Sequence, residues 1–223
     1  MSLALLAVLF TTPHAAFPNV SNDKAMKKIG FSLLVFIALV SSACDSRMTP
    51  DIKQNPHPAM RYDVTITITG APGPFDSVGG FMQYEVTNKA CVPETGGPMN
   101  PMRLAPMSNP PIVFTKVADN VYKGTVYADY FLDEDYFGLG VCHWSLMAVI
   151  TELKINKITF SPDLSPEQLF SQQTIPTYFV RQMYESNSDI ELSDPGEPNR
   201  FNYPPDRQEG IFTITLASRE NFQ

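Results

Sequence analysis

Hydrophobic and polar residues alternate along several segments of the chain, the pattern of strands with one buried face. The clearest segment is 61–69, where Val64, Ile66 and Ile68 alternate with polar residues. The same alternation or a short apolar run recurs at 81–88, 111–117, 121–130, 177–184 and 210–217. Together with the segment 141–155, these make about seven short strands, which predict a single all-β domain.

The segment 141–155 fits two patterns. As a helix, Leu146, Val149, Ile150 and Leu153 would form one apolar stripe. Three consecutive β-branched residues, Val149 to Thr151, favour a strand instead. Because apolar residues then lie on both faces, this strand is predicted to be central and covered on both sides.

One short helix is predicted at 161–170. Ser165 is its N-cap, Pro166 its first residue and Gln168 the partner in a capping box. Prolines elsewhere mark loops: 93–111 holds six prolines and three methionines, and 186–207 is acidic and polar. Loops of that length are usually functional or disordered. The fold class predicted is an antiparallel β-sandwich, immunoglobulin-like or similar, with long Pro-rich loops.

The N-terminal region contains an export signal. Met26-Lys27-Lys28 precedes twelve mostly apolar residues and then small residues up to Cys44, so 26–43 is predicted to be a secretory signal peptide. Its uncharged run, 29–43, has 15 residues, short of the roughly 20 that a membrane-spanning helix needs.

Val40-Ser41-Ser42-Ala43-Cys44 resembles the lipobox of bacterial lipoproteins, with Ser41 where leucine is usual. The resemblance implies that Cys44 is lipidated and becomes the first residue of a protein anchored in the bacterial envelope and facing the periplasm. Asp45 resembles the inner-membrane retention signal of enterobacterial lipoproteins. An ordinary signal peptide with a cysteine nearby is the alternative.

These features divide the chain. Residues 1–25, with no basic residue before their apolar start, are interpreted as a start-site artefact or an N-terminal extension. Residues 44–60 are predicted to be the lipidated cysteine and a flexible tether, and 61–223 the β-sandwich domain. The mature chain from Cys44 has 180 residues with 13 basic and 22 acidic side chains, a net charge of −9.

Two cysteines remain after Cys44. Because export delivers Cys91 and Cys142 to an oxidising compartment, we predict a disulfide between them. His143 is adjacent to Cys142, but neighbours on a strand point to opposite faces, so no Cys–His dyad is expected. A Ser–His–Asp hydrolase would have to use His143 and lacks a G-x-S-x-G elbow, so no catalytic residue is predicted.

The acidic balance argues against nucleic acid as a partner, and no cofactor is predicted. Acidic and aromatic side chains that interleave in one segment are the candidate surface for a protein partner. They are Asp129, Tyr130, Asp133, Glu134, Asp135, Tyr136 and Phe137.

Metal binding is the competing interpretation. Asp133 begins a segment that starts like a calcium loop but has Phe137 at a ligand position. Met99, Met102 and Met107 could supply thioethers to Cu(I). No metal ligand is predicted from either pattern.

The functional prediction is therefore a non-catalytic, lipid-anchored envelope protein that binds a protein partner through its long loops. Inhibitors and immunity proteins against periplasmic toxins are the analogous class. The alternative is a periplasmic lipoprotein that carries a small ligand or a metal (Ca or Cu), and an esterase or glycan hydrolase that uses His143 is third.

Overall fold

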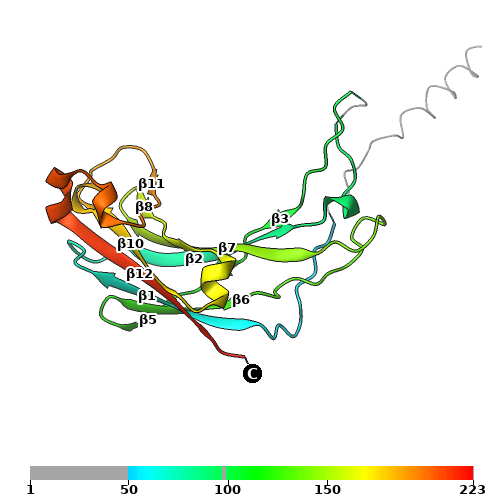
Figure 1. Cartoon of the computed structure of the whole chain (residues 1–223), viewed down its shortest axis with the longest axis horizontal. Helices are drawn as coiled ribbons and strands as arrows, with labels where there is room; N and C mark the ends of the chain where they lie inside the picture. Colours follow the sequence, from blue (N-terminus) through cyan, green and yellow to red (C-terminus); the bar gives the residue numbers. More distant parts are fainter. Residues whose placement is uncertain (1–49, 97–98, 223) are drawn as a thin grey trace, which may run out of the picture. The chain divides into compact units, whose positions relative to one another are not determined.

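Two β-sheets packed face to face make up the part of the chain that the computed structural model describes, residues 50–96 and 99–222 (Figure 1). The first sheet has the strand order β10-β12-β1-β6-β5, and the second β11-β8-β7-β2-β3. Two further short strands join the second sheet, β4 beside β2 and β9 beside β7. The predicted all-β sandwich is confirmed. Residues 1–49, with the predicted signal peptide and Cys44, lie outside the described residues.

The strands of the first sheet are β1 (Arg61–Thr69), β5 (Thr115–Ala118), β6 (Val121–Tyr127), β10 (Thr174–Val180) and β12 (Ile211–Glu220). Those of the second are β2 (Ser77–Val86), β3 (Met107–Ser108), β4 (Pro111–Ile112), β7 (Trp144–Ile155), β8 (Ile158–Phe160), β9 (Asp163–Leu164) and β11 (Leu192–Asp194). The helical segments are α2 (Pro166–Phe170), α3 (Arg181–Tyr184) and the 3-10 turns η1 (Lys89–Cys91), η2 (Arg200–Asn202) and η3 (Pro205–Gly210).

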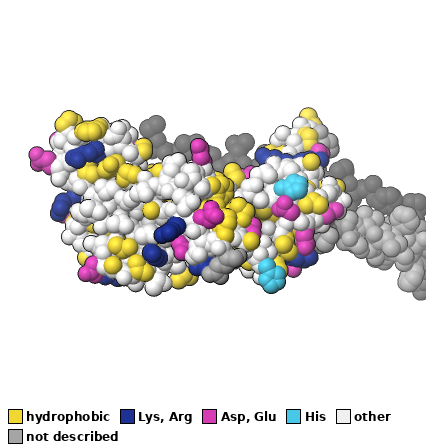
Figure 2. Space-filling model, turned by 60° about the horizontal axis from the view of Figure 1, so that its bottom comes forward, with side chains coloured by type: hydrophobic (Ala, Val, Ile, Leu, Met, Phe, Trp, Pro, Cys, Tyr) yellow, Lys and Arg dark blue, Asp and Glu magenta, His cyan; other side chains and the backbone are white. Residues whose placement is uncertain are grey.

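Strand β1 is the centre of the first sheet because alternate side chains face the core. It pairs antiparallel with β12 on one side and β6 on the other. Val64 and Ile66 are completely buried, and so are Ile214 and Leu216 of β12. The prediction for 61–69 is confirmed residue for residue. On its other face the first sheet presents threonines together with charged side chains such as Arg61 and Asp63, and Figure 2 shows one face of the molecule with charged side chains scattered over it.

The segment 141–155 contains strand β7, so the strand prediction is confirmed and the helix alternative is wrong. It lies between β2 and β8, so its central position is confirmed. Its predicted cover on both sides is wrong, because Met147 is exposed and Ala148 and Ile150 are only half-buried. A bulge at Met147 shifts the register against β2 between Gln83 and Tyr84. The bulge turns both Leu146 and Val149 toward the core, which a strict alternation does not allow.

Helix α2 forms as its sequence predicts. The Ser165 hydroxyl accepts a hydrogen bond from the Gln168 amide, and the Gln168 side chain accepts one from the Ser165 amide. The prediction of a single helix is incomplete, because 177–184 is a strand only as far as Val180 and then turns into α3. This turn lets Tyr184 fold back over the core, where its ring packs edge-on against Phe75 at 5.4 Å between centroids.

Other boundaries also differ from the predictions. The strand expected at 121–130 ends at Tyr127, and the Ala128 amide turns to bond the Met60 carbonyl. Within the expected loop 186–207, β11 pairs with β8 in parallel, so the second sheet is mixed rather than purely antiparallel. No helix within the described ranges is long and apolar enough to cross a membrane.

Two adjacent glycines of β2 provide a test of the sheet packing. A Cβ at Gly80 would lie 2.4 Å from the Ile150 carbonyl oxygen of β7, whereas a Cβ at Gly79 would meet nothing within 4 Å. We expect Gly80→Ala to lower the free energy of unfolding by at least about 1–3 kcal/mol, since β2 and β7 must separate. Gly79→Ala should leave it within about 0.5 kcal/mol. Urea denaturation measures both, and equal effects of the two substitutions would contradict this packing.

Candidate functional site

The predicted disulfide is formed, and it connects two segments at one end of the sandwich. The Cα atoms of Cys91 and Cys142 are 5.3 Å apart, and both residues are buried. Val86 and Val92 complete a small second core around them. The bond joins the start of the Pro-rich loop to the acidic segment.

The Asp129 carboxylate binds the chain that precedes the sandwich. It accepts hydrogen bonds from the amides of Ala59 and Met60, at 2.8 and 3.0 Å. The Asn55 side-chain amide donates to the Asp129 carbonyl at 2.9 Å. Further along, the Lys53 ammonium lies 2.7 Å from the Glu134 carboxylate. Residues 53–60, expected to be part of a flexible tether, therefore contact the sandwich through these bonds.

The remaining carboxylates of the predicted patch also have partners inside the protein. Asp133 accepts the Trp144 amide at 2.9 Å and contacts the His143 imidazole Nδ1 at 2.8 Å. Asp135 accepts the amides of Leu139 and Gly140. The four carboxylates thus organise the loop 129–142 and its contacts, although Asp133 and Asp135 remain exposed.

The aromatic residues of the patch divide between the core and the loop. Tyr130 and Phe131 pack against Tyr84, with the Phe131 and Tyr84 centroids 5.1 Å apart. Phe131 also lies 4.9 Å from the Trp144 ring. Burial raises the pKa of the Tyr84 phenol far above its ordinary value, and its hydroxyl donates to the Tyr127 carbonyl. Tyr136 and Phe137 pack on the disulfide cluster, and burial also raises the pKa of the Tyr136 phenol.

His143 forms an imidazole–carboxylate pair with Asp133 and no complete triad. Its backbone amide donates to the Asn88 side chain at 2.7 Å, which fixes its position. Among the hydrogen bonds of the described residues, none joins the imidazole to a serine, threonine or cysteine side chain. A group of three or more histidine, cysteine, aspartate or glutamate side chains suited to a metal ion is also absent from the residues described.

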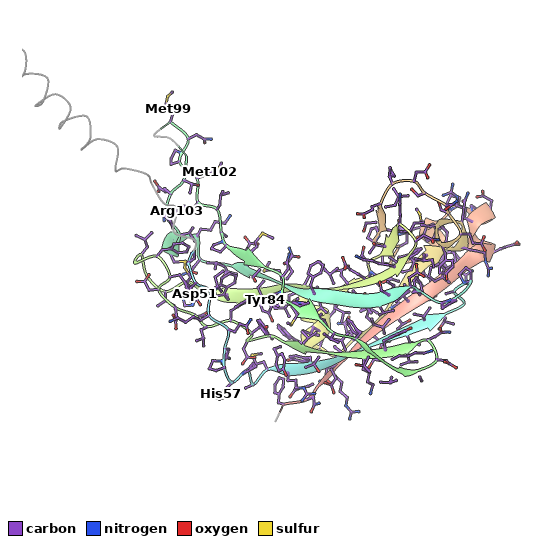
Figure 3. The ribbon with its side chains drawn as sticks, turned by 180° about the vertical axis from the view of Figure 1, so that it is seen from behind. Asp51, His57, Tyr84, Met99, Met102 and Arg103 are labelled. Atoms are coloured by element: carbon purple, nitrogen blue, oxygen red, sulfur yellow. A yellow bond between two sulfur atoms is a disulfide. The ribbon has the colours of Figure 1, made fainter. Side chains whose placement is uncertain are left out.

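The described residues 92–96 and 99–106 form a projection that we call the arm (Figure 1). Thr95 and Met102 exchange backbone hydrogen bonds across it. At its base the Arg103 guanidinium donates to the carbonyls of Ala90 and Val92 and lies 3.1 Å from the Glu94 carboxylate. Its exposed apolar side chains are Met99, Met102 and Leu104. Met107 is exposed beyond it in β3. Met99 lies at the far end of the arm, apart from Met102 (Figure 3).

Residues 186–210 form a second projection at the other end of the sandwich, which we call the lobe (Figure 1). The Glu197 and Tyr178 backbones exchange two hydrogen bonds of 2.9 Å, and the Tyr203 hydroxyl donates to the Tyr178 carbonyl. Gly196, at a φ of +72°, packs so closely on Phe179 that a Cβ would lie 2.5 Å from its ring. The lobe is therefore fixed to strand β10.

Outside the arm and the β4–β5 turn, the most exposed large hydrophobic side chains of the described residues lie in the lobe. Phe201 is 73% exposed and Ile190 is 67% exposed. The Arg200 guanidinium lies 5.8 Å from the centroid of the Phe201 ring, within the range of a cation–π contact. The length of 186–207 signalled a functional loop in the sequence, but nothing there distinguished Phe201 from a core phenylalanine.

The described surface also has two depressions. The larger, about 540 Å³, lies on the outer face of β1, β5 and β6 beside Arg61, Asp63 and Lys123. The smaller, about 250 Å³, lies between α3 and η3 beside Arg181 and Asp206. Neither is lined by His143 or by the arm.

Comparison of the chain with protein-family models, curated proteins and solved structures found no match to any of them.

The Asp129 carboxylate provides a test of the docked segment. In Asp129→Ala the amides of Ala59 and Met60 lose their acceptor, so we expect residues 53–60 to detach while the sandwich stays folded. Hydrogen exchange of this segment should accelerate at least about tenfold, whereas the exposed Asp163→Ala should leave it unchanged. Unchanged protection in Asp129→Ala would show that the carboxylate does not hold the segment.

Asp194, in β11, gives the lobe a pH dependence. Burial raises its pKa above the ordinary 3.8, although its carboxylate accepts the Gly196 amide at 2.9 Å. The folded state then binds more protons than the unfolded chain, so the charge destabilises the protein as the pH rises above about 4. We expect Asp194→Asn to be more stable than the wild type at pH 7 and to lose this advantage near pH 3. Urea denaturation across that range, with Asp163→Asn as control, measures it. A pH-independent difference would contradict it.

Proposed function

We propose that this chain is a non-catalytic lipoprotein of the bacterial cell envelope that binds a protein partner through its lobe. The observation that carries the proposal is the exposure of Phe201 and Ile190 on a backbone that several hydrogen bonds fix to the sandwich. The signal at 26–43 and the lipobox at Val40–Cys44 support export and lipidation.

Exposed aromatic and aliphatic side chains on ordered backbone are favourable anchors for a protein interface. Aromatic residues and arginine dominate binding energy in protein interfaces, and Phe201 and Arg200 lie together here. Because hydrogen bonds already order the lobe, binding loses little conformational entropy. The Asn199 side chain accepts the Phe201 amide at 3.0 Å, which adds to this order.

The lobe replaces the acidic–aromatic patch as the proposed contact surface. In the patch, the carboxylates of Asp129, Asp133 and Asp135 accept bonds from the protein itself, and binding a basic partner would compete with those bonds. Such an architecture, an anchored sandwich that presents a fixed loop, suits the inhibition or neutralisation of another protein. An inhibitor or immunity protein against a periplasmic toxin is the specific form that we propose.

The test is capture of a partner by the full-length, tagged lipoprotein from envelope extract. We expect a stoichiometric partner, and its recovery should fall at least about tenfold in Phe201→Ser/Ile190→Ser, because each change removes an apolar anchor. The matched control is Val113→Ser/Val117→Ser, which alters two exposed valines outside the lobe. Failure to recover a partner, or equal recovery with both double variants, would refute binding through the lobe.

A further inference from the structure

We propose that the arm, through Met99, Met102 and Leu104, inserts into the interfacial region of the bilayer that holds the lipid anchor. This inference rests on the proposed lipidation of Cys44. It adds a second membrane contact, made by side chains of the folded sandwich.

The arm presents apolar side chains to solvent, and its described residues carry no net charge. Met99 is fully exposed, and Leu104 and Met102 are 64% and 45% exposed. The described residues 95–96 and 99–102 carry no charge, and the flanking Glu94 and Arg103 neutralise each other at 3.1 Å. Exposed apolar residues grouped in this way are typical of an interaction surface. The lack of charge favours contact with lipid.

The arm is held away from the sandwich by its base. The Arg103 guanidinium binds the carbonyls of Ala90 and Val92, next to the Cys91–Cys142 disulfide. The Thr95 and Met102 backbones then pair, which extends the arm beyond that base. The apolar side chains therefore cannot fold onto the core without breaking these bonds.

The chain enters the folded unit beside the same base. The Lys53 amide contacts the Tyr136 hydroxyl and the Lys53 ammonium contacts Glu134, whose backbone in turn bonds to Cys142. Figure 3 places Asp51 near the foot of the arm, with Met99 at its far end. The described chain thus begins at the end of the sandwich that carries the arm.

Chain length keeps the arm within reach of the membrane. The six residues from Cys44 to Pro50 span at most about 22 Å whatever their conformation. Met99 lies four residues beyond Arg103, about 13 Å in an extended strand. A bilayer that holds lipidated Cys44 therefore lies close enough for the arm to contact it.

Charge favours a bilayer contact through the arm over contact through neighbouring surfaces. The mature chain has a net charge of −9, and anionic lipid headgroups repel it. At this end of the sandwich, Asp133, Glu134 and Asp135 are partly exposed or exposed in the acidic loop. The arm, whose Glu94 and Arg103 pair and leave it without net charge, approaches lipid without that repulsion.

Insertion would orient the sandwich. Strand β7 runs from Trp144, at the arm end, to Ile155, beside the lobe, and its 12 residues span about 40 Å. With both the lipid and the arm in the bilayer, the lobe faces away from the membrane. This orientation would present Phe201 and Ile190 to a partner.

The test uses the mature chain with Cys44→Ser, which lacks the lipid, and vesicles of phosphatidylethanolamine and phosphatidylglycerol. We expect the protein to sediment with the vesicles. Met99→Ser/Met102→Ser/Leu104→Ser should lower the partition coefficient at least about tenfold, because three apolar side chains no longer leave water. The matched control Val113→Ser/Val117→Ser/Met147→Ser removes three exposed apolar side chains outside the arm and the lobe and should bind as before.

Three results would overturn the inference. The first is no vesicle binding by the parent protein, and the second is equal partition of the two triple variants. The third is an arm variant that still binds vesicles but no longer forms a dimer that the parent protein forms. The last would assign the arm to contacts between copies. Palmitate labelling of the wild-type lipoprotein in cells, with Cys44→Ser as control, tests the anchor separately. Loss of vesicle binding by the arm variant together with absent labelling would retain the arm contact and refute the lipid anchor.

Discussion

The Cys91–Cys142 disulfide is the constraint on which the arm, the acidic loop and the entry of the chain depend. It closes a loop of 52 residues, which stabilises the fold by about 4 kcal/mol on the chain-entropy estimate. The arm lies inside this loop, and Arg103 anchors it to backbone on both sides of Cys91. On the other side of the bond, Glu134 pairs with Cys142 and with Lys53. One covalent bond therefore fixes the arm, the acidic loop and the entry of the chain together.

The two ends of the sandwich are built differently. At the arm end, hydrogen bonds to Asp129, Asp133 and Asp135 hold the loops beside the disulfide cluster and the rings of Tyr84, Phe131 and Trp144. At the lobe end, Phe160, Phe179 and Phe212 pack ring against ring with centroids about 5 Å apart. This aromatic cluster supports strand β10, to which the lobe is bonded. These two sets of contacts support the ends of the sandwich. The sheets between them have largely polar outer faces.

Short sequence patterns predicted the elements that are specified by residues close together in the sequence. The alternation in 61–69 and the Ser165–Gln168 capping box each specify an element within ten residues, and both were correct. Contacts distant in sequence were missed: Asp129 binds Met60 across 69 residues, and β11 finds β8 in parallel across a long loop. The candidate patch was predicted from residue types alone, which do not reveal that its carboxylates accept bonds from the protein itself. Exposure of Phe201 likewise depends on the path of the lobe, not on its neighbours in sequence.

The orientation of the lipidated protein on a bilayer can be measured directly with spin labels. A label on Met99→Cys or Phe201→Cys adds one free thiol to a mature chain in which Cys91 and Cys142 are paired and Cys44 is proposed to be lipidated. Power saturation in vesicles compares accessibility to oxygen, which concentrates in lipid, with accessibility to a water-soluble nickel complex. We predict that the label at residue 99 is accessible to oxygen and protected from nickel, while the label at residue 201 is accessible to nickel. Equal nickel accessibility at both positions would contradict an arm in the membrane and a lobe facing away from it.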